Sequence, residues 1–91
     1  MAIQLKQGFV LRKIGPQYMA VPFGPMTTRV KGMISLSESG YMLWQAIEKG
    51  ADTKEALVAA LLAEYDVERD RAEADVHAFV ASLRGAGLLD D

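Results

Sequence analysis

The sequence predicts an α+β fold in which a three-stranded antiparallel sheet precedes three helices. The first 36 residues alternate apolar and polar side chains between Gly-Pro turns, which is typical of short strands. From residue 38 onward, apolar residues recur at three- and four-residue spacing, which is typical of amphipathic helices. Residues 33–44 join the two halves, because a short strand there passes into a helix within a few residues. The whole chain, 1–91, is predicted to form one domain.

Two strands, over 9–14 and 18–23, are predicted to form a hairpin around the Gly15-Pro16 turn. A polar loop over 24–31 leads to a third strand over 32–36. Strict alternation assigns each side chain to one face of its strand. The resulting groups are Phe9 with Leu11; Val10 with Arg12 and Ile14; Met19 with Val21 and Phe23; and Ile34 with Leu36.

The first helix is predicted over 38–49, with Ser37 as its N-cap and Gly50 as the glycine that ends it. The second helix is predicted over 53–65 and the third over 69–84. Each helix has one apolar stripe for the core. The stripes are Gly40, Leu43, Trp44 and Ile47; Leu57, Val58, Leu61, Leu62 and Tyr65; and Ala72, Val76, Phe79, Val80 and Leu83. A small sheet beside three helices is the content of a winged helix-turn-helix, here with the sheet first.

The sequence predicts a protein without catalytic activity. It contains no cysteine and one histidine, His77, which excludes disulfides and leaves no cluster of metal ligands. No serine has a plausible base other than His77, and no glycine-rich loop opens a helix to bind phosphate. We therefore expect no cofactor and no metal. The chain also lacks a signal peptide and a membrane span, so a cytoplasmic protein with no membrane partner is expected.

The residues alone leave two binding modes open. A third strand at the edge of the sheet has unpaired backbone groups that another chain can pair with, and residues 32–36 contain no charge or proline to prevent this. The partner strand can belong to a peptide or to a second copy, which would make a homodimer. The alternative is a winged-helix DNA-binding regulator. The formal charge of −2 and the mixed charges of the helices argue against it, so no nucleic-acid partner is expected.

The sequence resembles the PqqD-like family of stand-alone recognition domains for ribosomally made, modified peptides. The resemblance begins at Gly8-Phe9-Val10-Leu11-Arg12 and is strongest at 33–40, followed by Leu43-Trp44. Here the family has a Leu-Asn-x-x-Gly pattern, with Ser37 in place of its usual Asn. The resemblance continues through 61–67 and closes with Asp75-Val76, Phe79, Leu83 and Gly87-Leu88.

The resemblance implies a non-catalytic adaptor, or peptide chaperone, that binds a leader peptide and presents it to a modifying enzyme, often a radical SAM enzyme. In the family the peptide is added as a strand beside the third strand and against the third helix. Carried onto this sequence, the floor of the groove consists of Val30, Gly32, Met33, Ile34, Ser35 and Leu36. Its wall consists of Asp75, Val76, Phe79, Val80 and Leu83, and Asp75 is a candidate partner for a basic residue of the peptide.

Overall fold

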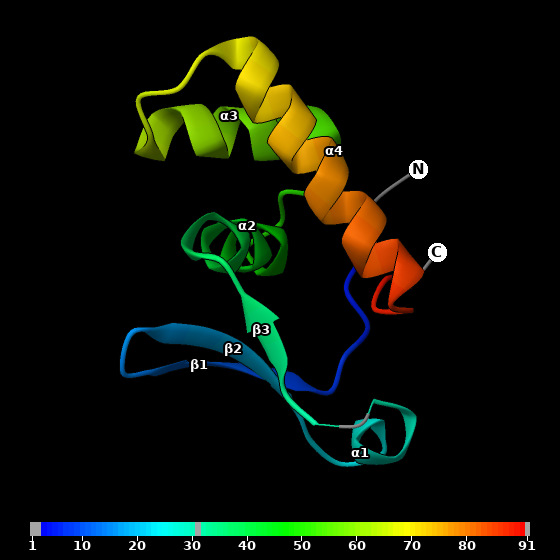
Figure 1. Ribbon diagram of the computed structural model, residues 1–91. Helices are drawn as coiled ribbons and strands as arrows, with labels where there is room; N and C mark the ends of the chain where they lie inside the picture. The colour runs from blue at the N-terminus through cyan, green and yellow to red at the C-terminus, as the bar shows by residue number, and fades with distance from the viewer. Residues whose placement is uncertain (1–2, 31, 91) are drawn as a thin grey trace.

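The computed structural model describes residues 3–30 and 32–90 and has the predicted α+β architecture (Figure 1). Helices α2, α3 and α4 lie on one side of a small antiparallel sheet, and α1 lies beyond one end of it. The strands are β1 (Phe9–Ile14), β2 (Gln17–Pro22) and β3 (Ile34–Leu36). The helices are α1 (Met26–Arg29), α2 (Glu38–Glu48), α3 (Lys54–Glu64) and α4 (Arg69–Gly85).

The sheet has the order β1-β2-β3, so β3 is an edge strand, as predicted. Tyr18 lies opposite Leu36, and Ala20 opposite Ile34. β2 begins and ends one residue earlier than predicted. β3 is shorter than the predicted 32–36, because Gly32 adopts a left-handed φ of 82° that takes the chain out of extended geometry.

The segment 24–31, predicted to be a polar loop, contains the short helix α1. The Thr27 and Thr28 hydroxyls donate to the carbonyl oxygens of Gly24 and Pro25, at 2.8 Å each, and hold this turn in place. Met26 is buried against Gly8, where a Cβ would meet its Cγ at 2.5 Å. The prediction of a loop from the polar composition of this segment was therefore wrong. The burial of Met26 and its close contact with the backbone of Gly8 decide the conformation.

Most residues of the predicted helix stripes are confirmed as the core, while Leu62, Tyr65 and Phe79 are partly buried and pack against it. The buried residues of α2 are Gly40, Leu43, Trp44 and Ile47, and the ring of Trp44 meets Phe9 edge-on with centroids 5.7 Å apart. Ser37 caps α2 as predicted, because its Oγ accepts a hydrogen bond from the Gly40 amide at 3.0 Å. The helices otherwise begin and end within one residue of their predicted bounds, with Thr53 capping α3.

The two ends of the described chain meet beside the core. Leu5 and Leu89 form an isolated antiparallel bridge, and the Asp90 amide donates to the Gln4 carbonyl oxygen at 2.7 Å. Leu88 and Leu89 are buried in the same cluster as Ile3. Over residues 3–30 and 32–90, no helix is both long and apolar enough to traverse a lipid bilayer.

Candidate functional site

The edge strand β3 is the first part of the candidate site. In an antiparallel pair, alternate residues of an edge strand direct their N–H and C=O groups away from the partner strand. The opposite edge of the sheet, β1, carries exposed Arg12 and Lys13, and charges of this kind discourage pairing with another chain. The Ile34-Ser35-Leu36 segment of β3 carries no charge. The two edges therefore differ, and β3 is the one suited to accept another strand.

A cleft of about 380 Å³ begins where β3 ends, between the first turn of α2 and one face of α4. Ser37 directly follows the last residue of β3, so the strand edge leads into the cleft along the chain. The residues that line it are Ser37, Ser39, Gly40, Leu43, Arg71, Asp75, Ala78, Phe79 and Ser82. An extended segment that pairs with β3 would therefore lie beside this cleft.

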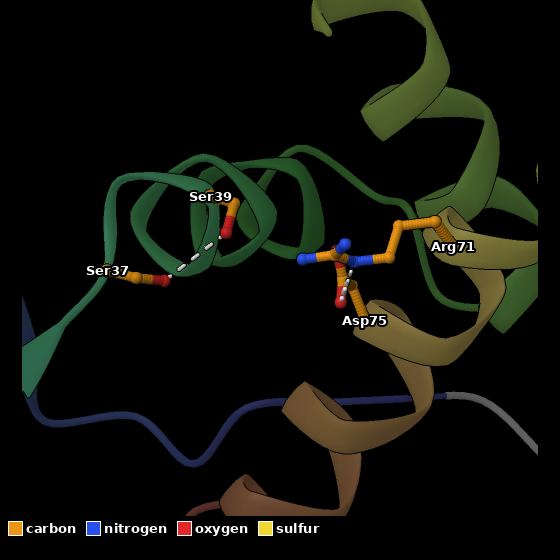
Figure 2. A network of polar contacts seen from close by, with 4 residues as sticks. All are labelled: Ser37, Ser39, Arg71 and Asp75. Carbon is orange, nitrogen blue, oxygen red and sulfur yellow. Dashed lines mark hydrogen bonds and ion pairs between the residues drawn. The ribbon is translucent and has the colours of Figure 1, made fainter. Parts of the chain in front are cut away.

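Polar groups line one part of the cleft (Figure 2). Ser37 Oγ and Ser39 Oγ lie 3.3 Å apart at the start of α2. On α4, one turn separates Arg71 from Asp75, and Arg71 Nε lies 3.4 Å from Asp75 Oδ1. Figure 2 shows the Arg71 side chain extending from α4 toward α2. The cleft thus offers hydroxyl groups, one cation and one carboxylate to a bound segment.

The apolar part of the cleft depends on close packing between α2 and α4. Leu43 is 1% exposed, whereas Phe79 is only partly buried and packs on the edge of the core. Gly40 allows the ring of Phe79 to approach the backbone of α2, since a Cβ at this position would lie 3.4 Å from Cε1 of the ring. Phe79 is therefore the accessible apolar side chain that α4 contributes.

The structure brings together only part of the predicted groove wall. Of its residues, Asp75 and Phe79 line the cleft. Val76, Val80 and Leu83 are at most 3% exposed and belong to the core. They support the wall from behind, because they lie on the buried face of α4, and a bound peptide cannot touch their side chains without the core opening.

The predicted floor residues divide in a similar way. Gly32, Met33 and Ser35 are exposed. Val30, Ile34 and Leu36 are partly buried and pack against the core. Because β3 alternates between these two environments, a peptide paired with its edge would meet backbone groups chiefly, with few side chains of β3 itself.

The structure adds Ser37, Ser39, Arg71, Ala78 and Ser82 to the predicted site. On α4, Arg71, Asp75, Ala78 and Ser82 follow one another at intervals of three or four residues. They form a strip of three polar residues and one alanine directly beside the buried stripe of the helix. The spacing was readable in the sequence, but which flank of the stripe borders α2 was not.

His77 lies outside the cleft, on the exposed surface of α4. Its Nδ1 is 3.2 Å from Lys54 Nζ, so the contact links α3 and α4. Among residues 3–30 and 32–90, no group of three or more His, Asp or Glu side chains is placed to hold a metal ion.

Two larger hollows occur elsewhere on the described surface. One, of about 740 Å³, lies beneath the N-terminal segment and is lined by Phe9, Trp44 and Ile47 among others. The other, of about 610 Å³, lies around Phe23 and Met26. Neither is lined by β3 or by a residue that adjoins it, whereas Ser37 of the smaller cleft directly follows β3, so we take the smaller cleft as the candidate site.

Comparison with known proteins identifies the family and the shared fold. The sequence model of the PqqD family, described as coenzyme PQQ synthesis protein D, matches residues 26–89. The chain belongs to the PqqD family. The matched PqqD region begins at α1 and contains β3, α2, α3 and α4, and therefore all of the candidate site. Among curated protein sequences, nothing matches the chain.

Two solved structures share the fold of this PqqD-family domain. One is described as TbiB1 in complex with the TbiA(beta) leader peptide. It is 25% identical, with a TM-score of 0.74 over 96% of this chain and 94% of that one. The other is described as lasso peptide synthetase B1 complexed with the leader peptide. It is 21% identical, with a TM-score of 0.76 over the full length of both chains.

Proposed function

We propose that this domain is a non-catalytic adaptor that captures a ribosomal precursor peptide through its leader segment and presents it to a modifying enzyme. The observation that carries the proposal is the edge strand β3 leading directly into a cleft between α2 and α4. Addition of a peptide strand needs this combination: backbone groups at a sheet edge for affinity, and adjoining side-chain pockets for selectivity. The leader-peptide complex of the 25%-identical TbiB1 supports the same class of ligand.

In the proposed complex, the leader segment pairs with β3 and extends the sheet by one strand. Every second side chain of the segment then points toward the helices. Such side chains would contact Phe79 and the polar rim of Ser37, Ser39 and Arg71. Asp75 would pair with a basic residue of the peptide, in exchange for part of its exposed contact with Arg71.

The adaptor role explains how a small domain can act without chemistry of its own. Holding the precursor and the enzyme together raises their effective concentration, so that an individually weak contact is sufficient. The receiving enzyme is proposed to be a radical SAM enzyme, following the family resemblance. A ribosomal precursor is made in the cytoplasm, which is accordingly the proposed location.

An NMR titration tests the proposed site. The labelled domain is titrated with the precursor peptide encoded beside it, and amide signals of residues 32–36, 37–40 and 75–82 are expected to shift. A scrambled leader of the same composition is the control. Shifts confined to other parts of the domain would overturn the proposed groove.

A second experiment tests strand addition itself. Single N-methyl groups are introduced at successive backbone amides of the leader peptide. Because alternate amides of an added strand face its neighbour, affinity should fall at every second position and stay within about twofold between them. A uniform response along the segment, or none, would exclude strand pairing as the binding mode.

A further inference from the structure

The side of the sheet facing away from the helices is an apolar surface outside the core. Phe9, Leu11 and Ala20 face the helices and belong to the core or pack against it. Their neighbours on the same strands, which point the other way, lie outside that cluster. We define the outer sheet face by these neighbours, Val10, Arg12, Ile14, Met19, Val21 and Ser35, with Met33 next to the start of β3. Phe23 follows β2 at the end of this face and also lines the hollow beneath the N-terminal segment.

Exposure on the outer sheet face is high for large apolar side chains. Ile14, Phe23 and Met33 are 52%, 52% and 53% exposed. In the middle of the face, Val10 lies opposite Val21 and is partly buried. Apolar side chains therefore cover the outer side of β1 and β2, and Met33 lies next to the start of β3. Exposed apolar patches of this kind on small proteins mark interaction sites.

The charged residues on this face and beside it are basic, except for Asp90 at the hollow around Phe23. Every charged residue before Glu38 is basic, namely Lys6, Arg12, Lys13, Arg29 and Lys31, whereas all 12 Asp and Glu residues lie from Glu38 onward. Arg12 is on the outer sheet face. Lys6 and Arg29 line the hollow around Phe23, where Asp90 is the single carboxylate.

From this arrangement we infer that the outer sheet face is the docking surface for the modifying enzyme, whose complementary surface is apolar, with acidic groups opposite Arg12 and at the end nearest Lys6 and Arg29. The inference rests on the proposed adaptor role, because an adaptor must contact the enzyme while it holds the peptide. The geometry permits both contacts together, since the cleft lies on the helix side of the sheet and the outer sheet face on the other.

Charge favours this occupant over the other candidates. A second copy docking through the same face would bring the two Arg12 side chains near one another at its centre, and no carboxylate of the outer sheet face is there to pair with them, which is repulsive. Stable attraction to an anionic membrane requires a cluster of about four to eight basic residues. The outer sheet face has Arg12 within it, with Lys6 and Arg29 at one end. A protein surface with apolar and acidic groups matches both the few cations and the apolar side chains of the outer sheet face.

The test uses the full chain and the modifying enzyme encoded beside it, with binding measured by isothermal titration calorimetry. The double variant R12E/M19E changes one charge and one apolar residue at the centre of the outer sheet face. We expect its affinity for the enzyme to fall at least tenfold and its affinity for the leader peptide to stay within twofold. Lys13→Glu is the matched control, because Lys13 follows Arg12 but lies on the opposite face, over the ring of Tyr18. This control should leave the affinities for the enzyme and for the leader peptide within twofold of the wild-type values.

Each other outcome contradicts the inference. Absence of enzyme binding by the wild-type domain, or an unchanged affinity in a folded R12E/M19E variant, would overturn it. Co-sedimentation with phosphatidylglycerol vesicles that the double variant abolishes would assign the face to a membrane instead. A dimer in sedimentation equilibrium that the double variant dissociates would assign it to a second copy.

Failure of the wild type to bind the leader peptide would contradict the proposed function separately, since the peptide is titrated in its own experiment. Ile14→Ser gives a second reading should the double variant not fold, because Ile14 is exposed and lies on the same face of β1 as Arg12.

Discussion

Gly40 in the first turn of α2 packs directly against the ring of Phe79 on α4. A Cβ added at Gly40 would lie 3.4 Å from Phe79 Cε1 and 3.1 Å from the Ser37 Oγ that caps the helix. The same glycine donates its amide to that Oγ at 3.0 Å. One small residue therefore joins the start of α2, the N-cap and the apolar part of the cleft.

Gly40→Val is expected to lower both stability and peptide affinity. A branched side chain would displace the Phe79 ring toward the cleft and disturb the cap, at a cost of about 1–3 kcal/mol in the free energy of unfolding. Urea denaturation measures the stability and fluorescence anisotropy with labelled leader peptide measures the affinity. Gly85→Ala is the control, because open space surrounds Gly85 and its φ is not left-handed. It should leave affinity unchanged and stability equal or slightly higher.

Asp75→Asn is expected to weaken leader binding severalfold with little effect on folding. Asp75 and Arg71 form an exposed i,i+4 pair, and such a pair contributes only about 0.3–0.5 kcal/mol to stability. The loss of affinity should shrink as salt is raised, because the lost contact is between charges. Anisotropy titrations at low and high salt measure this.

Glu73→Gln provides the matched control for Asp75→Asn. Glu73 forms the equivalent i,i+4 pair with Arg69 on the same helix, at 3.6 Å, and does not line the cleft. The two variants should have equal stabilities and different affinities. Equal affinities would show that Asp75 has no contact with the peptide.

Trp44→Ala is expected to remove most of the folded population. Trp44 is 1% exposed and packs against Phe9, and truncation of such a core residue costs about 3–5 kcal/mol. Small domains have total stabilities of about 5–15 kcal/mol, with chains of this size near the lower end. Far-UV circular dichroism during urea denaturation measures the loss. Phe23→Ala is the contrast, since Phe23 is 52% exposed and its truncation should change stability by less than about 0.5 kcal/mol.

Tyr65 is expected to make folding sensitive to alkaline pH. Burial raises the pKa of the Tyr65 hydroxyl above its ordinary value of 10.0, and the carboxylates of Glu38 and Glu64 act in the same direction. The folded state therefore binds this proton more tightly than the unfolded chain does. The resulting stabilisation is complete below pH 10.0 and is lost as the pH rises through the higher pKa of the folded state.

Urea denaturation of wild type and Tyr65→Phe at about pH 8 and about pH 11 tests this expectation. The wild type should lose more stability between the two conditions than the variant does. An equal loss in wild type and Tyr65→Phe would show that Tyr65 does not couple folding to pH.

Several parts of the fold were predictable because they depend on neighbours close in sequence. Ser37 and Gly50 mark the ends of α2 through local hydrogen bonding and a left-handed φ of 113°. The apolar stripes of α2, α3 and α4 follow from helical spacing alone. The helix α1 was missed, because Met26 is buried by Gly8, which lies 18 positions earlier in the chain.

By itself, the sequence determined the order of the strands and of the three longer helices, and the face of each of these helices that enters the core. It left the edge position of β3 as a condition, which the sheet order β1-β2-β3 meets. Only the tertiary structure decided that Phe79 borders the cleft while Val76 and Val80 are enclosed, and that Arg71 and the serines of α2 complete the rim. The reason is geometric. Periodicity gives the direction of each side chain around its own axis, but accessibility depends on how far the neighbouring element extends over it. At Phe79 that neighbour is the first turn of α2, which approaches closely because residue 40 has no side chain.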